Sequence, residues 1–157
     1  MKDVVVAASV MDRRGEIRVL SPEELQLSYR HSVLQEDGRI VLDITLEVVP
    51  ANGAEVLAKM EELSQRRISK QPLEMPSAGS VFKRPEGCFV GPLIEKAGLK
   101  GFRIGGAQIS VKHAGFIVNA GNATAADVLA LILYIRNKIW TDYQVQLKPE
   151  VLIIGEE

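Results

Sequence analysis

Residues 116–139 of this 157-residue chain read FIVNAGNATAADVLALILYIRNKI, and this stretch decides the fold. Phe116–Asn119 has the composition of a buried β-strand. Thr124, followed three residues later by Asp127, is typical of the capping box that opens a helix. The apolar residues that follow recur with helical spacing and are expected to face the core: Val128, Leu129, Ile132, Leu133, Ile135 and Ile139. A strand followed by a long apolar-faced helix predicts a mixed α+β fold.

The N-terminal part of the chain predicts a small antiparallel sheet. Val4–Val10 is β-rich, and a turn at Asp12–Gly15 leads into Glu16–Leu20, which indicates a hairpin. Ser21–Glu24 combines a capping serine, a proline and a capping glutamate, so a short helical turn is expected there. Ile40–Val49 alternates between apolar and polar residues and predicts a half-buried strand. Its expected core face consists of Ile40, Leu42, Ile44, Leu46 and Val48.

The composition changes after residue 50, which divides the chain into two expected parts. Residues 1–50 are rich in strands, whereas residues 51–157 mix helices and strands. Helical spacing of apolar residues predicts a helix that is capped by Asn52 and ends before Pro72. The basic stretch Arg66–Lys70 is interpreted as the solvated end of this helix.

The segment Gln71–Gly91 is the least regular part of the sequence because prolines and glycines recur through it. Long irregular segments inside compact domains are usually functional or mobile. A short helix is expected at Pro92–Ala97. The chain is expected to close with a strand over Val145–Ile154, interrupted by Pro149.

Composition excludes several classes of function. The formal net charge is −1 at pH 7, so the basic excess of a nucleic-acid-binding protein is absent. One cysteine, Cys88, allows no internal disulfide and no cysteine-based metal site, which favours a reducing, cytoplasmic setting. The most apolar stretch, Val128–Ile139, is too short to cross a bilayer and carries two basic residues. We therefore expect no nucleic acid, no membrane and no metal among the partners.

The irregular segment holds the first candidate for chemistry, SAGSVFKRP at residues 77–85. Gly79 allows the backbone to turn sharply and leaves the Ser80 hydroxyl accessible. Lys83 and Arg84 are suited to holding an anionic group. Serine and glycine are also common in plain surface turns, so a turn without a catalytic role is the alternative interpretation. The stretch lacks the nucleophile-elbow pattern, and with two histidines in the chain a serine hydrolase is a poorly supported alternative.

One further stretch and two single residues are candidates for a site. Gly101–Gly106 is glycine-rich but fits neither the Walker A nor the dinucleotide-binding pattern. Arg30 lies in an expected loop and would ordinarily be a solvated charge. Glu150 precedes a strongly apolar run, and burial there would raise the pKa of its carboxyl and allow it to act as an acid.

Taken in order, six segments resemble the UDP-N-acetylenolpyruvoylglucosamine reductase family, flavoenzymes of peptidoglycan synthesis. These segments are Leu27–Ser32 (LSYRHS), Ser77–Pro85 (SAGSVFKRP), Leu93–Gly101 (LIEKAGLKG), Arg103–Gln108 (RIGGAQ), Phe116–Asn119 (FIVN) and Pro149–Val151 (PEV). Together they extend over nearly the whole chain, and their shared order makes the resemblance specific.

The resemblance implies an organisation in domains. Residues 1–50 resemble the end of the family's second FAD-binding (PCMH-like) domain, and residues 51–157 resemble its α+β substrate-binding domain. Nothing in the sequence matches the family's N-terminal FAD-binding domain with its glycine-rich loop. The tyrosine-bearing insertion that longer members carry between the Val49 and Ser80 regions is also missing, as in the short subclass. The chain is thus expected to be inactive alone.

The resemblance also implies a reaction, the conversion of UDP-N-acetylglucosamine enolpyruvate to UDP-N-acetylmuramate, with NADPH as reductant and FAD as cofactor. By the family match, Ser80 is the proton donor to C2 after hydride reaches C3. Arg30 and Glu150 match residues that stabilise the intermediate, and Arg30 also lies at the cofactor. An isolated UDP-sugar-binding module without catalysis is the alternative.

Substrate-holding residues are expected around this centre. The candidates are Tyr29, Lys83, Arg84, Lys100 and His113. Arg84 stands where other members of the family carry asparagine, and His113 is equally consistent with a core histidine.

Overall fold

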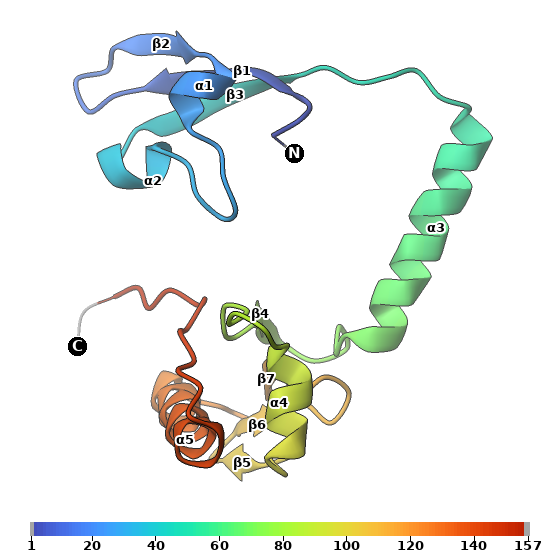
Figure 1. The fold of residues 1–157 in the computed structure, drawn as a ribbon, viewed down its shortest axis with the longest axis vertical. Coiled ribbons are helices and arrows are strands. Elements are labelled where there is room, and N and C mark those ends of the chain that lie inside the picture. The colour runs from blue at the N-terminus through green and yellow to red at the C-terminus, as the bar shows by residue number, and fades with distance from the viewer. Residues whose placement is uncertain (1, 156–157) are drawn as a thin grey trace. The chain divides into compact units, whose positions relative to one another are not determined.

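The computed structural model describes residues 2–155, and the chain divides into two compact units between Val56 and Leu57. We call them unit 1 and unit 2 and describe each by itself. Both combine helices with an antiparallel sheet, as the sequence predicts for an α+β chain (Figure 1).

Unit 1 is built on a three-stranded sheet in the order β2-β1-β3. The strands are β1 (Val5–Met11), β2 (Ile17–Leu20) and β3 (Ile40–Leu46), and β1 pairs antiparallel with both neighbours. The predicted hairpin is therefore confirmed. Two one-turn helices follow β2: α1 (Pro22–Leu25), and α2 (Leu34–Asp37), which the sequence did not reveal.

The cap of α1 has the geometry that its sequence predicts. The Glu24 amide donates to Ser21 Oγ at 3.3 Å, and the Ser21 amide donates to Glu24 Oε2 at 2.8 Å. Two backbone donors at the helix start are satisfied in this way. α1 in turn supplies Leu25 to the small buried cluster of unit 1.

The predicted burial of one β3 face is wrong. The cluster of buried residues in unit 1 consists of Ala8, Val10, Leu20 and Leu25, none of which lies on β3. All of β3 is exposed, and its apolar side chains have exposed fractions between 41% and 58%. The alternation correctly shows which side chains share a face, but a face is buried only where a second layer covers it.

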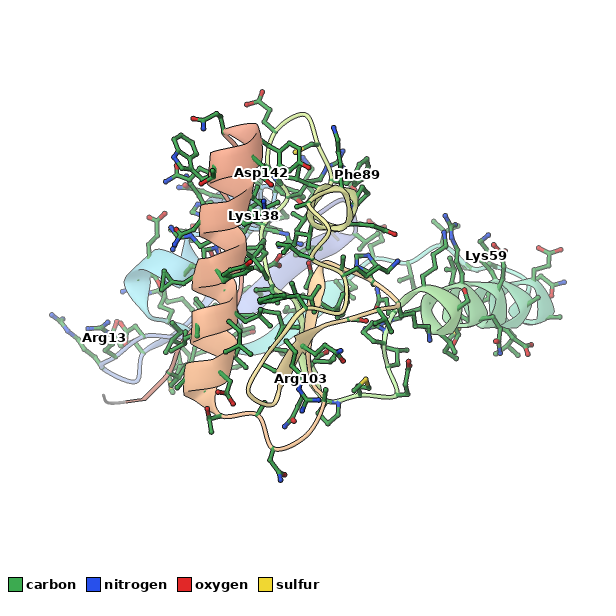
Figure 2. All side chains as sticks on the ribbon, turned by 90° about the horizontal axis from the view of Figure 1, so that it is seen from below. Arg13, Lys59, Phe89, Arg103, Lys138 and Asp142 are labelled. Carbon is green, nitrogen blue, oxygen red and sulfur yellow. The ribbon has the colours of Figure 1, made fainter. Side chains whose placement is uncertain are left out.

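Helix α3 (Gly53–Lys70) begins where the sequence predicts. Asn52 Oδ1 accepts hydrogen bonds from the amides of Ala54, at 2.9 Å, and Glu55, at 3.4 Å. Its side chains project around the helix, as Lys59 does in Figure 2, and none of its residues is buried. The apolar side chains at helical spacing are therefore present without being covered.

Unit 2 contains a four-stranded antiparallel sheet in the order β4-β7-β6-β5. The strands are β4 (Ser77–Ser80), β5 (Arg103–Ile104), β6 (Ala107–Ile109) and β7 (Phe116–Asn119). Helices α4 (Val90–Lys96) and α5 (Ala125–Tyr143) pack with the sheet around one core (Figure 1). Its fully buried large side chains include Phe82, Ile94, Ile109, Leu131, Ile135 and Ile139.

The start of α5 confirms the predicted capping box. Thr124 Oγ1 accepts from the Asp127 amide at 3.1 Å, and the Asp127 carboxylate accepts from the Thr124 amide at 3.0 Å. The same carboxylate accepts from the Gly106 amide at 3.2 Å, and this bond ties the β5–β6 turn to the helix. These backbone hydrogen bonds lower the pKa of Asp127 below its ordinary value.

Two expectations about the core face of α5 are wrong. Leu129 and Leu133 are exposed, whereas Leu131, which is not among the residues predicted to face the core, is fully buried. In an all-apolar run the periodicity does not single out one face, so packing against β5 and β6 selects it.

The predicted strand over Val145–Ile154 is also wrong, because this segment makes a single β-bridge, between Phe82 and Pro149. Proline has no amide hydrogen to continue a ladder. The irregular segment Gln71–Gly91, in contrast, contains strand β4, and the short helix α4 begins at Val90, two residues ahead of its predicted start.

Candidate functional site

Ser80 lies at the exposed end of β4 and pairs with Phe116 of β7. The prediction of a turn at this position is wrong, since the segment is a strand whose pairing is irregular between Ser77 and Ser80. The irregularity centres on Gly79, which has a φ of +86°, a conformation that favours glycine. A bulge of this kind re-aims the side chain that follows it and leaves the Ser80 hydroxyl accessible.

Backbone hydrogen bonds bring two other segments to Ser80. The Val81 amide donates to Gly115 O at 3.0 Å, and the Glu150 amide donates to Val81 O at 2.7 Å. Ser80, the His113–Gly115 turn and Glu150 are therefore neighbours on three adjoining backbone segments of unit 2. Glu150 is half-buried, and its Oε2 atom is fully buried.

His113 is held in a defined orientation beside this strand. Its Nδ1 accepts from the Gly115 amide at 3.1 Å, and its ring meets that of Phe116 edge-on at 5.1 Å. A Cβ at Gly115 would lie 3.0 Å from His113 Cε1 and 3.8 Å from Ser80 Oγ, so glycine at this position leaves room for both side chains. Because Nδ1 is an acceptor, the neutral ring carries its proton on Nε2.

A hollow of about 540 Å³ opens beside Ser80. Its lining residues come from the end of α3, the segment that follows it, β4 and β7: Arg67, Gln71, Pro72, Leu73, Met75, Pro76, Ser77, Gly79, Ser80 and Phe116. Arg67 is the charged residue of this lining, and its Nε donates to Gln71 Oε1 at 3.2 Å. From the sequence, Arg67 is predicted to lie on a solvated helix end, and no local pattern distinguishes it there from its neighbours.

The other basic candidates of unit 2 have different surroundings. Lys100 Nζ lies 2.9 Å from Glu95 Oε1, an exposed ion pair. The Arg84 guanidinium stacks 3.8 Å above the ring centre of Phe89, which is labelled in Figure 2. Lys83 is exposed, and its amide donates to Lys148 O at 2.9 Å. None of the three lines the hollow beside Ser80.

Tyr29 and Arg30 belong to unit 1 and are described only within it. Both lie in the tight loop closed by the bridge between Ser28 and His31. Arg30 adopts a φ of +55°, and its guanidinium carbon lies 5.6 Å from the centre of the Tyr29 ring. Because the left-handed region is unfavourable for a residue with a Cβ, this loop presents its arginine in a strained conformation.

Metal binding and membrane insertion were the remaining questions about the described residues. Among residues 2–155 no cluster of three or more His, Cys, Asp or Glu side chains is placed to bind a metal ion. Within the same residues, no helix is both long and apolar enough to span a membrane.

Comparison with known proteins identifies the class to which this fold and site belong. Residues 71–154 match the profile described as UDP-N-acetylenolpyruvoylglucosamine reductase, C-terminal domain. Relatives named UDP-N-acetylenolpyruvoylglucosamine reductase share 54% identity in Latilactobacillus sakei and 52% in Alkaliphilus oremlandii, each over the whole chain and 52% of the relative. The chain therefore belongs to the UDP-N-acetylenolpyruvoylglucosamine reductase family, as the sequence indicated.

A solved structure supports the same assignment. The reductase from Thermus caldophilus matches with a TM-score of 0.78 and 37% identity, over 95% of this chain and 53% of that protein. The chain thus spans about half the length of the curated relatives it matches.

Proposed function

We propose that this chain is the substrate-handling half of a reductase that converts UDP-N-acetylglucosamine enolpyruvate to UDP-N-acetylmuramate in the cytoplasm. NADPH is the reductant and FAD the cofactor. Residues 1–50 complete a flavin-binding domain whose N-terminal partner lies outside this sequence, and residues 51–157 bind the substrate. The observation that carries the proposal is the backbone hydrogen bond from Glu150 to Val81, the residue after Ser80, together with the open hollow beside Ser80.

The residues around Ser80 fit a flavin and a substrate lying together. The hydroxyl-bearing end of β4 is exposed, and a Cβ at Gly79 would meet nothing within 4 Å, so a planar ring system can approach the strand closely. FAD, when bound and reduced, supplies a hydride to C3 of the enolpyruvyl group. The chain's own residues then stabilise the negative charge and donate the proton that the reaction requires.

Ser80 donates the proton. Hydride addition to C3 leaves an electron pair on C2, delocalised into the adjacent carboxylate as an enolate. The Ser80 hydroxyl forms the new C2–H bond, and its alkoxide regains a proton from solvent or a neighbouring acid. A hydroxyl is a weak acid, but an enolate is basic enough to take its proton.

Glu150 and Arg30 stabilise the negative charge of the intermediate. Arg30 does so directly as a cation. Glu150 does so only when it is protonated or paired with a cation, because two anions repel each other. The Oε2 atom of Glu150 is buried, and its backbone is hydrogen-bonded to the residue after Ser80, which supports a place for Glu150 near the reacting group.

The remaining candidates hold the substrate in the same proposal. His113 presents an Nε2–H donor near the Ser80 strand, and Lys83 adds an exposed positive charge. Tyr29 and Arg84 offer an aromatic face and a stacked guanidinium. Lys100 must exchange Glu95 for a phosphate group in order to contribute.

A NADPH-oxidation assay tests the function. An enzyme comprising this chain and the family's flavin-binding half should oxidise NADPH when the enolpyruvyl substrate is added. Residues 1–157 by themselves should not, because no segment within them resembles the family's glycine-rich flavin-binding loop. Turnover by the purified chain alone would contradict the division of labour proposed here.

A UDP-sugar-binding module is the second candidate, favoured by the match to half of each relative. Calorimetry of the chain with the UDP substrate tests it. Heat of binding without turnover supports the module, and the absence of heat at millimolar substrate contradicts it.

A further inference from the structure

We propose that Arg67 binds an anionic oxygen group of the substrate in the hollow beside Ser80. The inference rests on the proposed function and adds to it a residue on α3, outside the six segments that carry the family resemblance. The ligand group is an oxyanion of a carboxylate or a phosphate. The enolpyruvyl carboxylate and the diphosphate of the proposed substrate both carry such oxygens.

The composition of the hollow points to an anion. Its lining combines the hydroxyls of Ser77 and Ser80, the amide of Gln71 and the guanidinium of Arg67 with apolar side chains, and none of the described lining residues carries a carboxylate. Hydroxyl and amide groups that share a hollow with a guanidinium provide several hydrogen-bond donors for one anionic ligand. An oxyanion in this hollow therefore gains an attraction that no lining carboxylate cancels.

The orientation of Arg67 suits bidentate binding. Its Nε donates to Gln71 Oε1 at 3.2 Å, one helical turn further along the chain. The bond uses one edge of the guanidinium and leaves the pair of terminal nitrogens as a separate fork. This fork matches the two oxygens of a carboxylate or phosphate, a match that lysine cannot reproduce.

The adjacent Arg66 supplies a matched control. It has the same charge and the same helix, but it is not among the residues that line the hollow. Successive residues differ by about 100° around a helix, so the two side chains leave α3 in different directions. Both arginines are exposed, so replacing either one removes no core packing.

The test uses the enzyme that combines this chain with its flavin-binding half. Its flavin is reduced with dithionite, so that NADPH binding does not affect the measured rate. The rate of flavin reoxidation is then followed as a function of substrate concentration. Arg67→Ala should raise the concentration that gives half the maximal rate by about tenfold or more, as expected for a lost charge-assisted bond. Arg67→Lys should restore only part of the loss, and Arg66→Ala should behave as wild type.

Inhibition by UDP distinguishes the two sources of the oxyanion. If Arg67→Ala also weakens UDP inhibition, the bound group is the diphosphate; if UDP inhibition is unchanged, it is the enolpyruvyl carboxylate. A half-saturating concentration within twofold of wild type in Arg67→Ala and Arg67→Met, with thermal unfolding unchanged, would overturn the inference. In that case a slow Ser80→Ala enzyme still upholds the proposed function, whereas a normal Ser80→Ala enzyme removes the proposed function itself.

Discussion

Unit 1 and unit 2 each contain an antiparallel sheet, but only unit 2 surrounds its sheet with a large core. In unit 2, α4 and α5 bury side chains together with β6 and β7. In unit 1, four apolar residues form the buried cluster, and every residue of β3 is exposed. A sheet supports a precise site only where packing fixes it. The large core of unit 2 therefore explains how the residues around Ser80 are held in fixed positions within that unit.

Truncation of a core side chain should expose this contrast most strongly. Ile139→Ala removes a fully buried side chain of α5 and should destabilise unit 2 by about 4 kcal/mol. Ile44→Ala on β3, where the side chain is half exposed, should cost less than about 1 kcal/mol in this chain. Hydrogen exchange resolved by residue measures each unit separately. Equal losses at the two positions would contradict the contrast.

The close packing of the β5–β6 turn against the loop before α5 offers a second test of the contrast between the two units. A Cβ at Gly106 would lie 2.3 Å from the Ala123 amide nitrogen and 2.3 Å from Gly121 O. Because backbone atoms must move, Gly106→Ala should destabilise unit 2 by about 3 kcal/mol. Gly53→Ala, where nothing lies within 4 Å, is the control and should be neutral or slightly stabilising. If the two variants had the same midpoint of thermal unfolding, this close packing would be disproved.

The smallest expected effect is the pH dependence that Asp127 gives to the stability of unit 2. The Thr124 and Gly106 amides hold the pKa of Asp127 below its ordinary value. The carboxylate therefore contributes stability above its unfolded pKa of about 4, and this contribution is lost as pH falls through the lower, folded pKa. Asp127→Asn should flatten the acid limb of the stability curve of unit 2. Asp43→Asn, on exposed β3, should leave that limb unchanged.

Features that depend on a few neighbouring residues were predictable from the sequence. The capping boxes at Ser21 and Thr124 are of this kind, because the partner lies three residues away. The exposure of β3, the core face of α5 and the lack of a strand over Val145–Ile154 depend on which layers meet in space. A single sequence does not specify those layers.

The residues of the candidate site also fall into two groups, those found from the sequence and those that only the fold brings together. Ser80 and Glu150 were found through the family resemblance, although Ser80 lies in a bulged strand instead of the predicted turn. Their adjacency across Val81 follows from backbone pairing between segments about 70 residues apart in the sequence. Arg67 was missed because its neighbours in the hollow are assigned by the fold and not by any spacing along α3.

The central claim is that Ser80 donates a proton after hydride transfer. The most direct test follows the two half-reactions of Ser80→Ala separately, in the enzyme that joins this chain to its flavin-binding half. We predict that reduction of the flavin by NADPH stays near the wild-type rate, while reoxidation by the enolpyruvyl substrate slows by about 100-fold or more. Equal losses in the two half-reactions, or reoxidation at the wild-type rate, would contradict the claim.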